Sequence, residues 1–276
     1  MKKVILISSL LIAIIGLKAQ SDDKKIEKIT FLMVDAKYQD VAFKCTKLLE
    51  DPEYRKNAWV FYYLSQAYYE IAKSEELQEE YPKAMKDALK AAYKLDKYKN
   101  KPKENYEVYQ EAQEYLSKLK DSTITISEVY YDQDNPRKAA YYMGRIVKFD
   151  PDDHAMWLMK GVYEIKARNI GEGVKSIIRA MDSLTIDYQP DPVSIQTLVD
   201  ALDEYALIVK SGEYDQYFKA YKFEPTSSDV NEALAMKEEF KKLIKGEVVD
   251  KVERKKESEV IFKTFRSDSE DEEEED

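Results

Sequence analysis

The chain has 276 residues, of which only seven are Gly and eight are Pro, and 44% are hydrophobic. So few backbone-breaking residues argue against a turn-rich β sandwich or barrel, and the apolar content is enough for a packed core. The single Cys and single His exclude an intramolecular disulfide, a Cys-based zinc site and any site that needs two histidines. The formal net charge of −10 argues against nucleic-acid binding, which needs a basic face.

Residues 1–19 are predicted to be a secretory signal peptide. Lys2 and Lys3 precede an apolar run over residues 4–17, and Ala19 is a small residue suited to cleavage before Gln20. The run is shorter than the roughly 20 apolar residues that span a bilayer, although an uncleaved membrane anchor is the alternative. The segment resembles the signals of exported Gram-negative proteins. We therefore expect a periplasmic or secreted protein with no stable membrane span after cleavage.

Apolar residues at helical spacing predict a series of helices in the first half of the chain. A helix that begins near Tyr38 ends at Asp51-Pro52, and a second helix, apolar almost all round, covers 58–73. Charged residues lengthen the turn over 73–81, and 97–103 is a polar linker that contains Pro102.

The second half continues in the same way. Asn135-Pro136 opens a helix that ends at Asp150-Pro151, because Pro is favoured in the first turn of a helix. A helix over 194–209 is followed by a tight turn at Gly212-Glu213-Tyr214. The last predicted helix, over 228–245, is capped by Thr226, Ser227 or Ser228 and stopped by Gly246.

The clearest internal unit lies at 154–187. Its Trp157, Gly161, Gly173 and Ala180 have spacings that resemble the tetratricopeptide repeat (TPR), a helix–turn–helix unit of about 34 residues. In that family, small residues at the last three of these positions allow the two helices to cross closely. Lys160 stands where the family usually has Leu, so the unit is divergent.

The resemblance implies an all-α, TPR-like α-solenoid of about four to five helical hairpins over 20–246, with a C-terminal capping helix. A two-helix unit cannot bury its apolar face alone, so neighbouring units must stack. Residues 247–276 follow as a charged linker, a short apolar motif and a disordered acidic tail, in which eight of the last nine residues are Asp or Glu.

Little in the sequence predicts chemistry, and we expect no catalytic, cofactor or metal site. His154 begins a helix in the repeat register and is expected to be exposed or capping, while Cys45 falls at a buried repeat position. The pair Gly171 and Gly173 lacks the strand and longer motif of a phosphate loop. Acidic pairs such as Glu79-Glu80 do not stand out as a catalytic dyad.

Candidate partner-binding residues come from three places. The chain has 22 Tyr, and those of the 58–73 helix belong either to the core or to a peptide-binding groove. Tyr suits such a groove because it provides apolar contact area with a polar tip and loses little conformational entropy on binding. The apolar motif in the C-terminal region either docks on a partner or packs on its own chain. The candidates are Tyr62, Gln66 and Tyr69 in the 58–73 helix, Ala155, Leu158, Val162, Ile165 and Lys166 by resemblance to the repeat, and Ile261, Phe262 and Phe265 in the apolar motif.

Together, the resemblance and the predicted export imply a non-catalytic interaction scaffold or accessory subunit of a cell-envelope assembly. A protein segment would occupy the concave groove, and the acidic tail would either keep the chain soluble or contact a basic surface. The alternatives are a periplasmic chaperone that holds unfolded clients and a carboxylate-based envelope hydrolase.

Overall fold

The computed structural model describes residues 23–244, and every regular element in this range is helical. The prediction of an all-α protein is therefore confirmed for the described residues. The predicted signal peptide, Gly246 and the predicted tail lie outside them.

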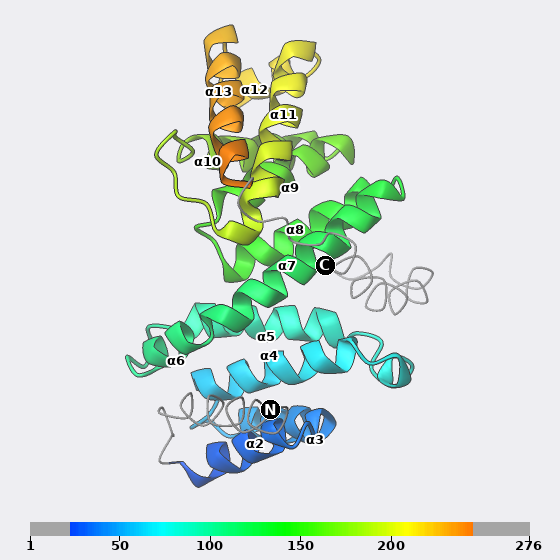
Figure 1. Ribbon diagram of the computed structural model, residues 1–276, viewed down its shortest axis with the longest axis vertical. Coiled ribbons are helices and arrows are strands. Elements are labelled where there is room, and N and C mark those ends of the chain that lie inside the picture. Colours follow the sequence, from blue (N-terminus) through cyan, green and yellow to red (C-terminus); the bar gives the residue numbers. More distant parts are fainter. Residues whose placement is uncertain (1–22, 245–276) are drawn as a thin grey trace, which may run out of the picture.

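The helices follow one another along the long axis of the molecule, from α2 and α3 at one end to α11–α13 at the other (Figure 1). The elements are α2 (Lys24–Val34), α3 (Tyr38–Glu50), α4 (Ala58–Ala72), η1 (Glu75–Leu77), α5 (Ala84–Tyr98), α6 (Asn105–Glu111), α7 (Gln113–Asp132), α8 (Pro136–Phe149), α9 (His154–Lys166), α10 (Ile170–Met181), η2 (Pro192–Ser194), α11 (Ile195–Ser211), α12 (Asp215–Ala220) and α13 (Ser227–Ile244).

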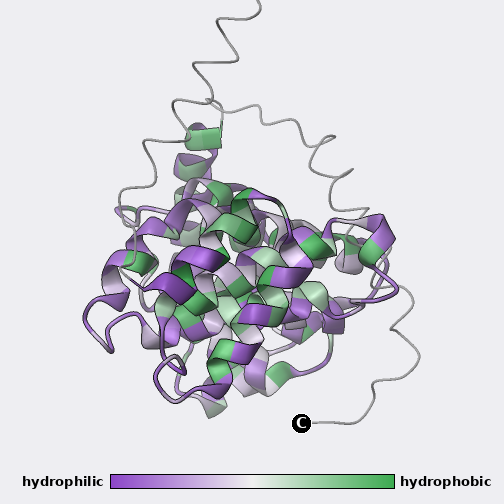
Figure 2. Cartoon of the chain, turned by 90° about the horizontal axis from the view of Figure 1, so that it is seen from below, coloured by the Kyte–Doolittle hydropathy of each residue, from purple (hydrophilic) through white to green (hydrophobic). Residues whose placement is uncertain are grey.

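Consecutive helices pack in pairs: α2 with α3, α4 with α5, α7 with α8, and α9 with α10. Each pair also contacts its neighbour, through α3 on α4, α5 on α8, and α8 on α9. Viewed from the α2–α3 end, the peripheral loops are mostly hydrophilic and the apolar residues lie along the helices (Figure 2). Buried apolar residues, from Ile26 in α2 to Phe240 in α13, form one connected cluster.

Three of the turns within these pairs have the same backbone geometry. Each is three residues long, and its middle residue, Ala36, Asp134 or Arg168, has φ of 54°, 58° or 64°. In each turn the amide of the next residue donates to a carbonyl five residues earlier, which is the Schellman arrangement that ends many helices. Asp134 and Arg168 are 34 residues apart, so the turns over 133–135 and 167–169 recur at the period expected for the repeat unit.

The pair α9 and α10 crosses at two glycines that touch through their backbones. A Cβ atom on Gly161 would lie 2.8 Å from the carbonyl oxygen of Gly173, and one on Gly173 would lie 2.9 Å from the carbonyl oxygen of Gly161. Ala180, further along α10, is fully buried. The prediction that small residues at these positions mark a close crossing is confirmed.

The last helix, α13, packs on α11 and begins where the sequence predicted. The Thr226 hydroxyl oxygen accepts from the amide of Ser228 at 3.2 Å, and the Asp229 carboxylate accepts from the amide of Thr226 at 2.5 Å. This reciprocal capping satisfies amides that have no partner within the helix. Within residues 23–244, no helix combines the length and the apolar character that crossing a membrane requires.

Cys45 in α3 is completely buried, as predicted, and burial raises the pKa of its thiol to about 12. Because the thiolate is the reactive form, we expect iodoacetamide at pH 8 to alkylate the folded chain at least a hundredfold more slowly than the chain in denaturant. Mass spectrometry of timed samples measures both rates. Equal rates would mean that α3 does not pack as described.

Candidate partner-binding groove

A groove of about 320 Å³ lies between α4 and the junction of α6 with α7. We call it the tyrosine groove. It is lined by Met33, Tyr38, Tyr62, Gln66, Tyr69, Glu70, Glu111, Glu114, Tyr115 and Lys118. All three candidates that the sequence indicated in the 58–73 helix are among these residues, whereas α5 and α8 contribute none.

The groove follows from how successive helix pairs meet. The second helices of two pairs, α5 and α8, pack directly on each other, whereas the first helices, α4 and α7, are bridged through side chains. On α4, the positions of Tyr62, Gln66, Tyr69 and Glu70 are spaced by four, three and one residues, which places them along one face of the helix. The sequence therefore presents a polar and aromatic face where the two helices separate.

Hydrogen bonds across the groove hold its tyrosines in place. The Tyr115 hydroxyl of α7 lies 2.7 Å from Ser65 Oγ of α4, and the Tyr69 hydroxyl lies 2.8 Å from Ser122 Oγ. The Tyr115 ring lies 5.9 Å from that of Tyr62 at a tilt of 58°, and 5.9 Å from that of Tyr69 at 71°. Rings in such tilted pairs are favourable partners. Tyr69 and Tyr115 are each only 7% exposed, so Tyr62 is the one ring of the three that is partly accessible.

The groove has an acidic lining in which two of three carboxylates have a partner. Glu114 lies 2.7 Å from Lys118 Nζ, and Glu70 lies 3.1 Å from Lys73 Nζ. Glu111 is solvent-accessible at the end of α6, and partial burial by nearby atoms raises the pKa of its carboxyl. The pKa of Tyr62 is raised to about 12, mainly by burial and secondly by the negative charge of Glu111. Tyr62 is therefore a neutral phenol at physiological pH.

The groove positions predicted on α9 are wrong. Ala155, Leu158 and Val162 are 0% exposed and Ile165 is 2% exposed, so none of them is available to a partner. The reason is that α9 packs against α8, α10 and α11 at once. Lys166 remains at the surface, where its ammonium lies 3.0 Å from Glu204 of α11. The candidates Ile261, Phe262 and Phe265 lie outside the described residues.

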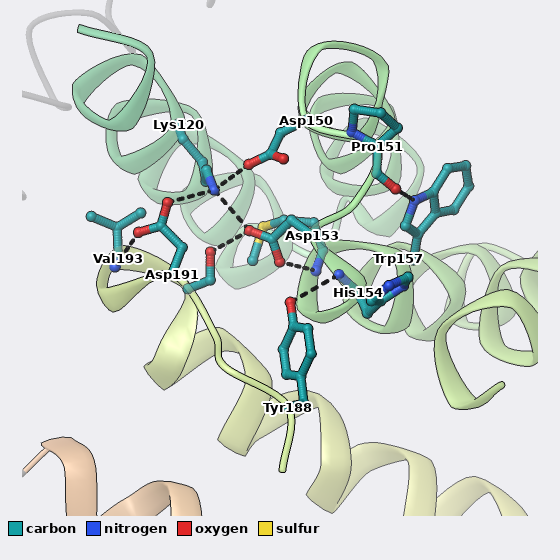
Figure 3. Close-up of polar contacts among 11 residues, drawn as sticks. Lys120, Asp150, Pro151, Asp153, His154, Trp157, Tyr188, Asp191 and Val193 are labelled. Atoms are coloured by element: carbon teal, nitrogen blue, oxygen red, sulfur yellow. Dashed lines mark hydrogen bonds and ion pairs between the residues drawn. The ribbon is translucent and has the colours of Figure 1, made fainter. Parts of the chain in front are cut away.

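The structure also contains a buried charge cluster that the sequence analysis missed (Figure 3). Lys120 of α7 is 2% exposed, and its ammonium lies 2.5 Å from Asp150, 2.9 Å from Asp153 and 2.8 Å from Asp191. Burial opposes the charged form of Lys120, but the charges of Asp153 and Asp150 outweigh it and raise the pKa of Lys120. One cation thus joins α7 to the α8–α9 turn and to the segment before α11.

Two of the three carboxylates in this cluster, those of Asp153 and Asp191, also accept hydrogen bonds from backbone amides. Asp153 accepts from the amide of Met156 at 3.3 Å and thereby caps α9, and it also accepts from Ser194 Oγ at 2.6 Å. Asp191 accepts from the amide of Val193 at 3.0 Å at the start of η2. The cluster is therefore a structural tie, since its acceptor groups are occupied by Lys120, Ser194 and helix-terminal amides.

His154 lies beside this cluster and is half-buried rather than fully exposed. Its amide donates to the Tyr188 hydroxyl at 3.2 Å, and the two rings meet edge to face at 5.6 Å.

Among the described residues, no group of three or more His, Cys, Asp or Glu side chains is arranged to hold a metal ion. No family model matches the chain, and no curated protein matches its sequence.

Proposed function

We propose that this chain is a non-catalytic protein-interaction scaffold whose tyrosine groove binds an extended or helical segment of another protein. The observation that carries the proposal is the groove itself, which is lined mostly by the first helices of successive helix pairs, α2, α4 and the α6–α7 segment, with Tyr38 from the start of α3. In repeat arrays such helices line the surface on which partners are bound.

We further propose that the helix pairs form a TPR-like α-solenoid with α13 as its C-terminal cap. Two observations support this. The turns centred on Ala36, Asp134 and Arg168 share one geometry, and α9 crosses α10 at the glycines that correspond to small positions of the repeat. The family usually has small residues at such crossings because they let two helix backbones approach closely.

The side chains of the groove suit protein recognition. Tyrosine combines a large apolar face with a polar tip and has few rotatable bonds, so it loses little entropy on binding. At about 320 Å³ the groove is at the lower end of ordinary binding pockets, which favours insertion of one or two side chains of a longer segment.

The proposed location of the protein in the cell rests on the predicted signal peptide. A signal peptide over 1–19 would direct the chain to the periplasm or outside the cell, where it would serve as a scaffold or accessory subunit of a cell-envelope assembly. The acidic tail would give it a second contact with a basic surface.

The test of the proposed function is a selection of displayed 12-residue peptides on the intact mature chain, followed by titration of the enriched peptides. We expect enriched peptides to share a pattern and Tyr62→Ala to weaken their binding at least tenfold, because buried aromatic side chains dominate protein interfaces. Tyr106→Ala is the matched control, since Tyr106 is 46% exposed on α6 and does not line the groove.

Gln66→Ala provides a second groove variant if Tyr62→Ala unfolds the chain, because Gln66 is only half-buried on α4. Circular dichroism of each variant separates loss of binding from loss of fold. Weak enrichment of many unrelated sequences would indicate a chaperone instead, and equal binding by the native chain and both groove variants would contradict the proposal.

A further inference from the structure

We propose that the tyrosine groove recognises a cationic side chain, Lys or Arg, in the segment that it binds. This inference rests on the proposed function and specifies the partner's chemistry. The groove lining includes three carboxylates, of which Glu70 and Glu114 are paired with Lys73 and Lys118, so one negative charge, on Glu111, is left in excess. A bound cation would reduce this excess of negative charge.

Glu111 is the carboxylate best placed to receive the cation. Glu70 and Glu114 are paired with Lys73 and Lys118, whereas Glu111 makes no ion pair or hydrogen bond within residues 23–244. It is also close enough to Tyr62 and Tyr63 for its charge to raise the pKa of both hydroxyls. An added cation would therefore meet an unpaired carboxylate beside aromatic rings.

The rings themselves favour the same ligand. Tyr62 is half-buried and packs on the buried Tyr115 ring at 5.9 Å, so it is the ring that a partner can reach. A cation within about 6 Å of a ring centre is attracted to the ring face. The Lys73 ammonium already lies 5.3 Å from the centre of the Tyr69 ring on one side of this cluster. A second cation from a partner would occupy the side toward Glu111.

The chain itself contains the arrangement that we infer. Lys99 places its ammonium 2.7 Å from Asp96 and 4.7 Å from the centre of the Tyr109 ring. The same three chemical groups, a carboxylate, a tyrosine ring and an ammonium, would meet in the groove, with the carboxylate and the ring supplied by Glu111 and Tyr62. The missing ammonium would come from the partner.

The experiment uses the peptides enriched by the intact mature chain. We expect a Lys or Arg at one shared position, and replacement of that residue by norleucine should weaken binding to the native chain at least tenfold. With Glu111→Gln, the cationic and norleucine peptides should bind within threefold of each other. Glu107→Gln is the matched control, because Glu107 is an exposed α6 residue that does not line the groove.

The outcomes separate this inference from the proposed function. Enriched peptides that depend on Tyr62 but share no cation, or that share an acidic residue, would overturn the cation preference and leave the interaction scaffold standing. No enrichment would overturn both. A tenfold preference for Lys over norleucine that persists in Glu111→Gln would overturn the role of Glu111.

Discussion

Replacing Lys120 with Met is expected to destabilise the protein by about 3–5 kcal/mol, the usual cost of removing one partner from a buried ion pair. The substitution leaves Asp150, Asp153 and Asp191 close together with no cation between them. The repulsion among these carboxylates, together with their loss of solvation, weakens the packing of α7 against the α8–α9 turn and against the segment before α11. Urea unfolding followed by circular dichroism at pH 7 measures the effect.

Lys118→Met is the matched control, since Lys118 lies on the same helix and its side chain is 64% exposed in its pair with Glu114. Such surface pairs contribute about 0–1 kcal/mol. In Lys120→Met the crowded carboxylates should have pKa values raised above those of the unfolded chain. Stability relative to the native protein should therefore recover as the pH falls from 7 toward 4. Equal loss in the two variants would show that the cluster is not buried as described.

Gly161→Ala is expected to destabilise the protein by about 1–3 kcal/mol, although Ala normally favours a helix over Gly. The added methyl group would lie 2.8 Å from the carbonyl oxygen of Gly173 and 2.9 Å from the amide nitrogen of Ile177. These are backbone atoms, so α9 and α10 would have to move apart. Thermal unfolding monitored by circular dichroism measures the change.

Gly144→Ala on α8 is the control for this substitution. The nearest atom to its Cβ would be Lys160 Cε, at 3.5 Å and at the far end of a flexible side chain. Here the helix preference of Ala should dominate and stabilise the protein by about 0.4–1 kcal/mol. If Gly161→Ala were as stable as Gly144→Ala, the two backbones would not touch at this crossing.

Sequence reasoning succeeded where local pattern decides structure. The start of α8 at Pro136, the cap at Thr226 and the glycines of the α9–α10 crossing each depend on residues near in the chain or on a repeat period. On α4, Tyr62, Gln66 and Tyr69 all line the groove, although Tyr69 is 7% exposed and belongs to the core; their role in binding a partner stays a prediction.

The same reasoning failed where distant segments decide structure. Lys120 is followed by its partners 30, 33 and 71 residues later, and a lysine in a charged helix gives no sign of burial. On α9, the predicted groove positions became core because α11 packs onto that helix. Whether a helix face is exposed depends on how the next helix pair packs against it. The repeat spacing alone does not predict this packing.

The tyrosine groove is the proposed binding surface, and hydrogen exchange with and without an enriched peptide locates the binding surface directly. We expect slower amide exchange on peptide binding in α4 and in residues 105–122, with little change in α10 and α13. Slower exchange confined to α10–α13, or no change in α4, would contradict the account.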